Sequence, residues 1–91
     1  MKKKDTFVTT LKHSEILHYA ILGLTPRCEE HIVRIKSAAN QSAEIQEAVR
    51  NIAAPWLSKL KKLCELYEME TGEEYSLRAG STIDLSDLKD F

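Results

Sequence analysis

The chain is poor in the residues that cross-link or interrupt small folds: its 91 residues include only two cysteines, two prolines and three glycines. Two cysteines are too few for the disulfide framework of a small secreted domain. So few glycines and prolines leave little material for the many tight turns of an all-β protein. These absences favour a helical protein whose Cys28 and Cys64 stay reduced, as expected in the cytoplasm.

Long apolar runs are also absent. The longest, from Tyr19 to Leu22, is far shorter than the roughly 18 residues that a transmembrane helix needs. Lys2, Lys3 and Lys4 resemble the basic start of a signal peptide, but polar residues follow them where an apolar segment would be required. We therefore expect neither a membrane span nor a membrane partner.

The composition is that of one globular domain, with 43% hydrophobic and 30% charged residues and a net charge of -1. A pI of about 6.3 excludes a uniformly basic nucleic-acid binder. A domain of this size buries only something over about 60% of its unfolded surface, so its core is small. Self-association would enlarge that core, which favours an oligomer.

The near-neutral charge is a cancellation between two parts of the chain. Residues 1–64 carry 11 basic and six acidic groups, which gives a net charge of +5. Residues 65–91 carry two basic and eight acidic groups, which gives a net charge of -6. One interpretation is a phosphate-binding basic face for which the acidic tail competes; the other is an ordinary solvated surface. The candidate basic residues are Arg34, Lys36, Arg50, Lys59, Lys61 and Lys62.

Local signals in the first half predict two short helices joined as a hairpin. A first helix starts at Thr10 or Ser14, and Gly23 provides a residue suited to the left-handed end of a helix. Thr25 is then suited to be the N-cap of a second helix, and Pro26 is suited to be the first residue of that helix. The apolar stripes of the two helices are Leu17, Ile21 and Leu24, then Cys28, Ile32, Ile35 and Ala39.

The strongest periodic signal comes next and predicts one long helix from Ala43 to about Glu70, ended by Gly72. Ser42 is its N-cap. Pro55 lies inside it without shifting the apolar phase, so we expect a kinked continuous helix. Its apolar residues recur at spacings of three and four: Ile45, Val49, Ile52, Trp56, Leu60, Leu63 and Tyr67.

Beyond Gly72 the pattern changes. Residues 75–79 and 82–85 alternate as strands do, so a marginal two-stranded hairpin and an irregular segment both remain open. The last residues could form one helical turn presenting Leu85, Leu88 and Phe91, which we take as candidate tail-docking residues. This divides the chain into a flexible basic arm (1–9), a helical domain (10–72) and an acidic C-terminal segment (73–91).

The predicted fold is all-α: a helical hairpin plus one long Pro-kinked helix in a small bundle, with a short extended or irregular C-terminal segment. The long helix extends beyond two short ones, so its far end needs a cover from the C-terminal segment or from another chain. We favour another chain, in a twofold homodimer. The predicted interaction seam is Trp56, Leu60, Leu63 and Tyr67.

Signals for chemistry are weak. The chain has no Gly-rich phosphate loop, nucleophile elbow or His-Glu-x-x-His motif, so we expect no enzyme, no catalytic residue and no cofactor. Cys28 and His31 have helical i, i+3 spacing, but a paired Cys-x-x-Cys anchor for zinc is missing, and we predict no metal site. A helix-turn-helix reading is disfavoured because Glu29 and Glu30 would face phosphates.

The sequence therefore predicts a small, non-enzymatic cytoplasmic protein that acts in protein–protein interaction or regulation, as a homodimeric helical bundle. The alternative is a nucleic-acid-binding regulator that uses the basic helical face, modulated by the acidic tail; nucleic acid is possible but not favoured.

Overall fold

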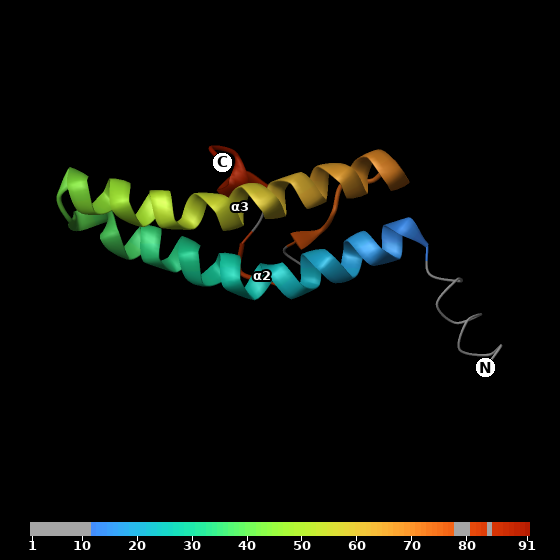
Figure 1. Ribbon diagram of the computed structural model, residues 1–91, viewed down its shortest axis with the longest axis horizontal. Helices are drawn as coiled ribbons and strands as arrows, with labels where there is room; N and C mark the ends of the chain where they lie inside the picture. Colours follow the sequence, from blue (N-terminus) through green and yellow to red (C-terminus); the bar gives the residue numbers. More distant parts are fainter. Residues whose placement is uncertain (1–11, 78–80, 84) are drawn as a thin grey trace.

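The computed structural model describes residues 12–77, 81–83 and 85–91. It consists of helix α2 (His13–Ser37), the short 3-10 turn η1 (Ala38–Asn40), helix α3 (Ala43–Thr71) and the 3-10 turn η3 (Leu85–Leu88). The two long helices pack side by side and run in opposite directions, and the C-terminal segment returns across them (Figure 1). No strand occurs in these described ranges. The predicted all-α class is confirmed.

The predicted break between two short helices at Gly23 is wrong, because α2 continues through Gly23 and Pro26. Pro26 removes only one backbone donor from the helix, so the helix can continue past it. The hydroxyl of the preceding Thr25 donates a hydrogen bond to the Ile21 carbonyl at 2.6 Å, within the same helix. The apolar stripe of α2 continues in phase across this point and is buried against α3: Leu17, Ile21, Cys28 and Ile32. Burial of that stripe outweighs the local stop signals, so the hairpin of this protein is the pair α2 and α3.

Helix α3 is one continuous helix, as predicted, and the kink predicted at Pro55 stays a prediction. It runs from Ala43 to Thr71 without interruption at Pro55, a length of about 44 Å at 1.5 Å per residue. The Ser42 hydroxyl accepts from the backbone N–H of Ile45 at 3.4 Å, as expected of an N-cap. Gly72 ends the helix with a φ of 78°, a left-handed conformation that glycine adopts without a Cβ penalty.

The C-terminal segment packs back on the hairpin. Its buried side chains join the same core as Leu57 and Leu60 of α3: Tyr75, Leu77, Ile83 and Leu88. The backbone N–H and hydroxyl of Thr82 both donate to the Glu29 carboxylate of α2, at 2.8 and 2.9 Å. The segment therefore covers one face of the hairpin and completes its core.

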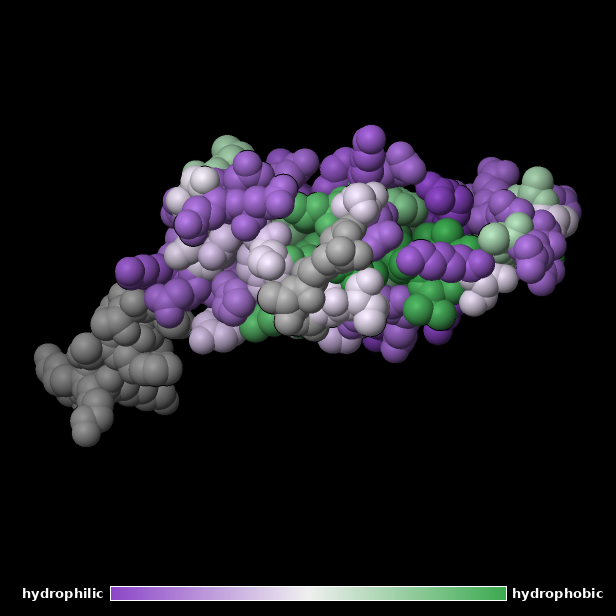
Figure 2. Space-filling view, turned by 180° about the vertical axis from the view of Figure 1, so that it is seen from behind, coloured by the Kyte–Doolittle hydropathy of each residue, from purple (hydrophilic) through white to green (hydrophobic). Residues whose placement is uncertain are grey.

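Figure 2 shows one face of the surface that results, on which apolar side chains gather in the middle between hydrophilic ones along the edges. No helix in the described part of the chain has an apolar stretch that could cross a bilayer. The predicted arm, residues 1–9, lies outside the described residues.

Candidate functional site

The predicted interaction seam is divided between three environments. Leu60 is fully buried in the core, and no second chain is needed to cover it because the C-terminal segment does so. Tyr67 packs edge-on against Tyr75 of that segment, with ring centroids 4.9 Å apart. Trp56 and Leu63 are only partly buried.

Trp56 and Leu63 lie on what we call the open face of the hairpin, together with three other residues of the predicted apolar stripe of α3: Ile45, Val49 and Ile52. At about 100° per residue, they occupy a side of α3 roughly a quarter turn from the side that contacts α2. Arg50 and Lys61 contact the C-terminal segment. By helical phase they lie on the other flank of the side of α3 that contacts α2. Along the middle of α3 the open face and the side that the C-terminal segment covers therefore lie on different flanks of the contact with α2, whereas near the end of α3 Tyr67 contacts Tyr75 of that segment.

Trp56 is the centre of a compact cluster on this face. The Arg27 guanidinium lies 5.0 Å and the Lys59 ammonium 5.7 Å from the centroid of its ring, distances typical of cation–π contacts. The His31 ring stacks beside it at 6.1 Å, and the Cys28 thiol donates to the Trp56 carbonyl at 3.4 Å. The cluster fixes the indole in place and joins the two helices at the middle of the hairpin.

His31 is unusual because it is only 4% exposed and its Nε2 atom is buried without a hydrogen-bond partner in the described structure. Burial lowers the pKa of the imidazole, and the positive charges of Arg34 and Arg27 lower it further, against a smaller opposing effect of Glu30. The neutral imidazole is therefore the form that fits this site.

The three candidate tail-docking residues contact the chain's own helices. Leu88 is fully buried, and Leu85 and Phe91 are partly buried against the core. The Arg50 guanidinium lies 4.8 Å from the centroid of the Phe91 ring, and the Lys61 ammonium donates to the Lys89 carbonyl at 3.2 Å. Leu88 is therefore committed to the chain's own core, whereas Leu85 and Phe91 keep part of their surface exposed.

The candidate phosphate-binding residues do not share one face. Arg50 and Lys61 lie toward the C-terminal segment, whereas Lys59 lies against Trp56 on the other flank of α3. By helical phase Arg34 lies on the side of the open face, Lys36 on the opposite side of α2, and Lys62 points away from the hairpin contact. A phosphate backbone could reach only part of this set at once.

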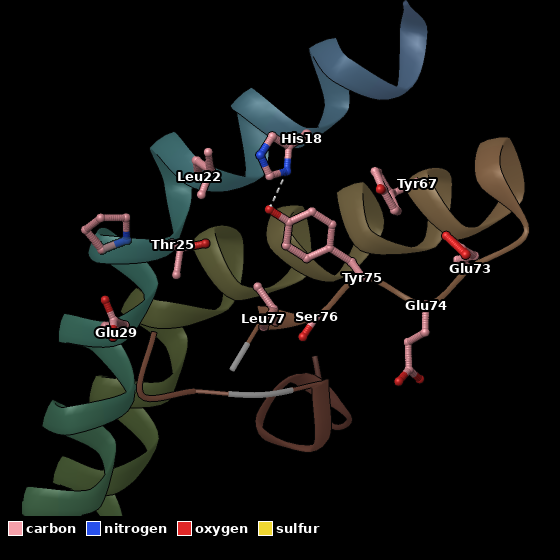
Figure 3. Close-up of a pocket in the computed structure, with 11 residues that line it drawn as sticks. His18, Leu22, Thr25, Glu29, Tyr67, Glu73, Glu74, Tyr75, Ser76 and Leu77 are labelled. Carbon is pink, nitrogen blue, oxygen red and sulfur yellow. Dashed lines mark hydrogen bonds between the residues drawn. The ribbon is translucent and has the colours of Figure 1, made fainter. Parts of the chain in front are cut away.

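A cavity of about 450 Å³ lies between the middle of α2, Tyr67 near the end of α3 and the segment that follows α3 (Figure 3). Across its middle, the Tyr75 hydroxyl and the Nδ1 atom of His18 share a hydrogen bond of 2.8 Å. Tyr75 is buried, which raises the pKa of its phenol, as do the nearby Cys64 and Tyr67. The phenol therefore stays protonated and available as a hydrogen-bond donor.

Sequence reasoning missed this cavity. His18 and Tyr75 are 57 positions apart, and neither belongs to a motif. Only the return of the C-terminal segment onto α2 brings them together, so no local signal in the sequence could have identified them.

The residues noted for zinc do not converge on a metal site. Within the described ranges, no group of three or more His, Cys, Asp or Glu side chains is placed to hold a metal ion. Cys28 and Cys64 are free and buried, and burial raises the pKa of each thiol to about 11, with a smaller contribution to Cys64 from Cys28. Both are therefore protonated, unreactive members of the core at neutral pH.

Comparison with known proteins identifies no relative: no family model matches the chain, and no curated protein or solved structure is significantly similar to it.

Proposed function

We propose that the protein is a small, non-enzymatic interaction protein that acts as a homodimer, in which the open faces of two hairpins meet to form a four-helix bundle. The observation that carries this proposal is the one-sided cover of the hairpin. The C-terminal segment completes the core on one face, and on the other Ile52 is 63% and Ile45 46% exposed beside a partly buried Trp56. Other large apolar side chains, such as Leu22 and Val33, are exposed elsewhere on the hairpin, outside the cluster around Trp56. Large apolar side chains gathered on one face are typical of a contact surface.

The size of the open face suits this role. From Ile45 to Leu63 it extends about 27 Å along α3, and two adjacent helices are about 20 Å wide, which gives about 540 Å². A standard protein interface buries about 800 Å² of accessible surface on each partner, and the accessible surface of side chains exceeds the flat area. Trp56 and Arg27 at its centre are residue types that often dominate binding energy.

The distribution of charge favours a second copy as the occupant. The last turns of α3 and the residues after them are acidic, with Glu65, Glu68, Glu70, Glu73 and Glu74. Arg27, Arg34 and Lys59 lie nearer the middle and the closed end of the hairpin. Two antiparallel copies would bring the acidic end of each toward the basic part of the other, which is the arrangement of an antiparallel bundle.

Sedimentation velocity or light scattering at micromolar concentration tests the dimer, and Ile52→Lys tests the face. Because Ile52 is exposed in the single chain, the substitution costs the fold little but would bury an unpaired charge in the dimer. The matched control is Met69→Lys, which adds the same charge to α3 at a residue that is 79% exposed and lies off the open face. We expect a dimeric wild type, a dimeric Met69→Lys and a monomeric, folded Ile52→Lys. A monomeric wild type refutes the proposal.

Pro55 bears on how the two hairpins meet. It lies in α3 close to Trp56, and a proline inside a helix removes one backbone hydrogen bond and bends the axis. We infer that a bend here sets the curvature of the open face. Pro55→Ala should leave the protein folded but weaken or alter the dimer; unchanged assembly would show that Pro55 matters only for packing within the chain.

We infer a cytoplasmic location on one observation: both cysteines are free thiols, the state expected in a reducing compartment.

A further inference from the structure

We propose that the cavity beside the His18–Tyr75 hydrogen bond binds a linear aliphatic polyammonium ion. The cavity is lined by α2, by Tyr67 near the end of α3 and by the segment that follows α3, and none of the open-face residues of α3 is among its lining residues. It therefore represents a ligand site in addition to the proposed dimer contact.

The middle of the cavity is apolar and aromatic. Leu22, Pro26 and Leu77 form one part of its wall, and Tyr67 and Tyr75 form another. Figure 3 shows the hydrogen-bonded His18–Tyr75 pair between these groups, spanning from α2 to the segment that follows α3. A volume of about 450 Å³ is within the range of roughly 300–1,000 Å³ that small-molecule sites occupy.

Carboxylates lie at the margins of this apolar middle. Glu29 projects from α2 at one side, and Glu73 and Glu74 follow the end of α3 at the other (Figure 3). Among the described residues that line the cavity there is no Lys or Arg. The Glu29 carboxylate accepts two hydrogen bonds from Thr82, which leave its charge in place, and Glu73 and Glu74 are exposed. The Tyr67 and Tyr75 rings add surfaces that attract ammonium groups.

The pattern determines the class of ligand. Negative charge at the two sides and apolar surface between them complement a molecule with ammonium groups separated by methylene chains. A single small cation would leave the apolar walls in contact with water, and a neutral apolar ligand would make no use of the negative charge at the margins. A polyamine such as spermine satisfies both requirements, and its ammonium groups can form charge-assisted hydrogen bonds with Glu29 and Glu73.

Isothermal titration calorimetry of the full chain with spermine tests the proposal, with amide NMR shifts to locate binding. Glu29→Gln is the first variant, because glutamine retains an oxygen to accept from Thr82 while it removes the charge. We expect Glu29→Gln and the double variant Glu73→Gln/Glu74→Gln each to weaken spermine binding at least about tenfold, the cost of losing a charge-assisted hydrogen bond. Leu22→Lys, which puts an ammonium into the mouth of the cavity, should weaken it at least as much.

The matched control is Glu47→Gln, which removes the same charge from an exposed position in the first half of α3, distant from the cavity. It should bind spermine within about twofold of the wild type, because exposed charges beyond a Debye length are screened. Equal losses in Glu47→Gln and Glu29→Gln would overturn the proposal, since binding would then be diffuse electrostatic attraction. Absence of spermine binding to the folded wild type at millimolar concentration would also overturn it.

Two further comparisons test whether the ligand needs ammonium groups and whether it is a free polyamine or part of a peptide. The diamine 1,8-diaminooctane should bind at least about tenfold more tightly than 1,8-octanediol, which has the same chain without charge; equal affinities would overturn the assignment of an ammonium ligand. Trilysine should bind no more tightly than spermine. Binding of trilysine that is tenfold tighter than that of spermine would overturn the assignment of a free polyamine as the ligand. The site would then be assigned to lysine side chains of a peptide.

Discussion

The substitution Gly23→Ala distinguishes sharply between one continuous α2 helix and two helices that break at Gly23. In the structure Gly23 is exposed, has helical neighbours on both sides, and a Cβ built on it meets no atom within 4 Å. Glycine in a helix interior is about 1 kcal/mol less favourable than alanine, because it loses more backbone freedom on folding. Gly23→Ala should therefore stabilise the protein by about 1 kcal/mol, which corresponds to a rise in Tm of about 4–8 °C for a domain of this size.

Gly72 provides the internal comparison. It has a φ of 78°, and a Cβ there also meets no atom within 4 Å, so backbone conformation alone separates the two glycines. A non-glycine residue in the left-handed conformation costs roughly 1–2 kcal/mol. Gly72→Ala should therefore destabilise the protein by about that amount while Gly23→Ala stabilises it.

Urea unfolding of both variants, followed by far-UV circular dichroism and by the fluorescence of Trp56, measures the two effects. The protein concentration must be held constant, since any dimerisation adds to apparent stability. If Gly23 instead ended a helix in the left-handed conformation, both variants would be destabilised by similar amounts. That result would refute the continuous helix and restore the hairpin predicted from the sequence.

Three other predictions concern the tail, the buried imidazole and the thiols. Leu88→Ala should cost about 2–5 kcal/mol of stability in the same urea assay, because Leu88 is fully buried; a cost below about 0.5 kcal/mol would mean that the tail rests on the surface. The pKa of His31 is lowered on folding, so the unfolded chain takes up the proton first and stability falls as pH drops below about 6.5. His31→Phe keeps the stack on Trp56 and should reduce that loss, seen by comparing unfolding at neutral pH and at about pH 5; an unchanged pH dependence contradicts the assignment. Cys28 and Cys64 should react with a thiol reagent only as fast as the protein opens, because both are buried with pKa values of about 11; fast labelling of the folded protein argues against that burial.

The sequence by itself determined the features that depend on neighbouring residues. Both ends of α3 follow from local chemistry, since the Ser42 hydroxyl accepts a backbone N–H of the first turn and Gly72 adopts the left-handed conformation that ends the helix. Its continuity through Pro55 follows from an apolar phase that does not slip at that residue.

Only the tertiary structure decided the features in which local and distant interactions compete. Thr25 and Pro26 carry strong signals for a helix start, yet burial of the surrounding stripe against α3 keeps α2 continuous through them. The cover over Leu60 and the pairing of His18 with Tyr75 both require the C-terminal segment to return onto the helices. Capping and turn preferences are worth about 1 kcal/mol each and can be read from adjacent residues. The burial of whole side chains is worth more, and it depends on which distant segment supplies the other half of the contact.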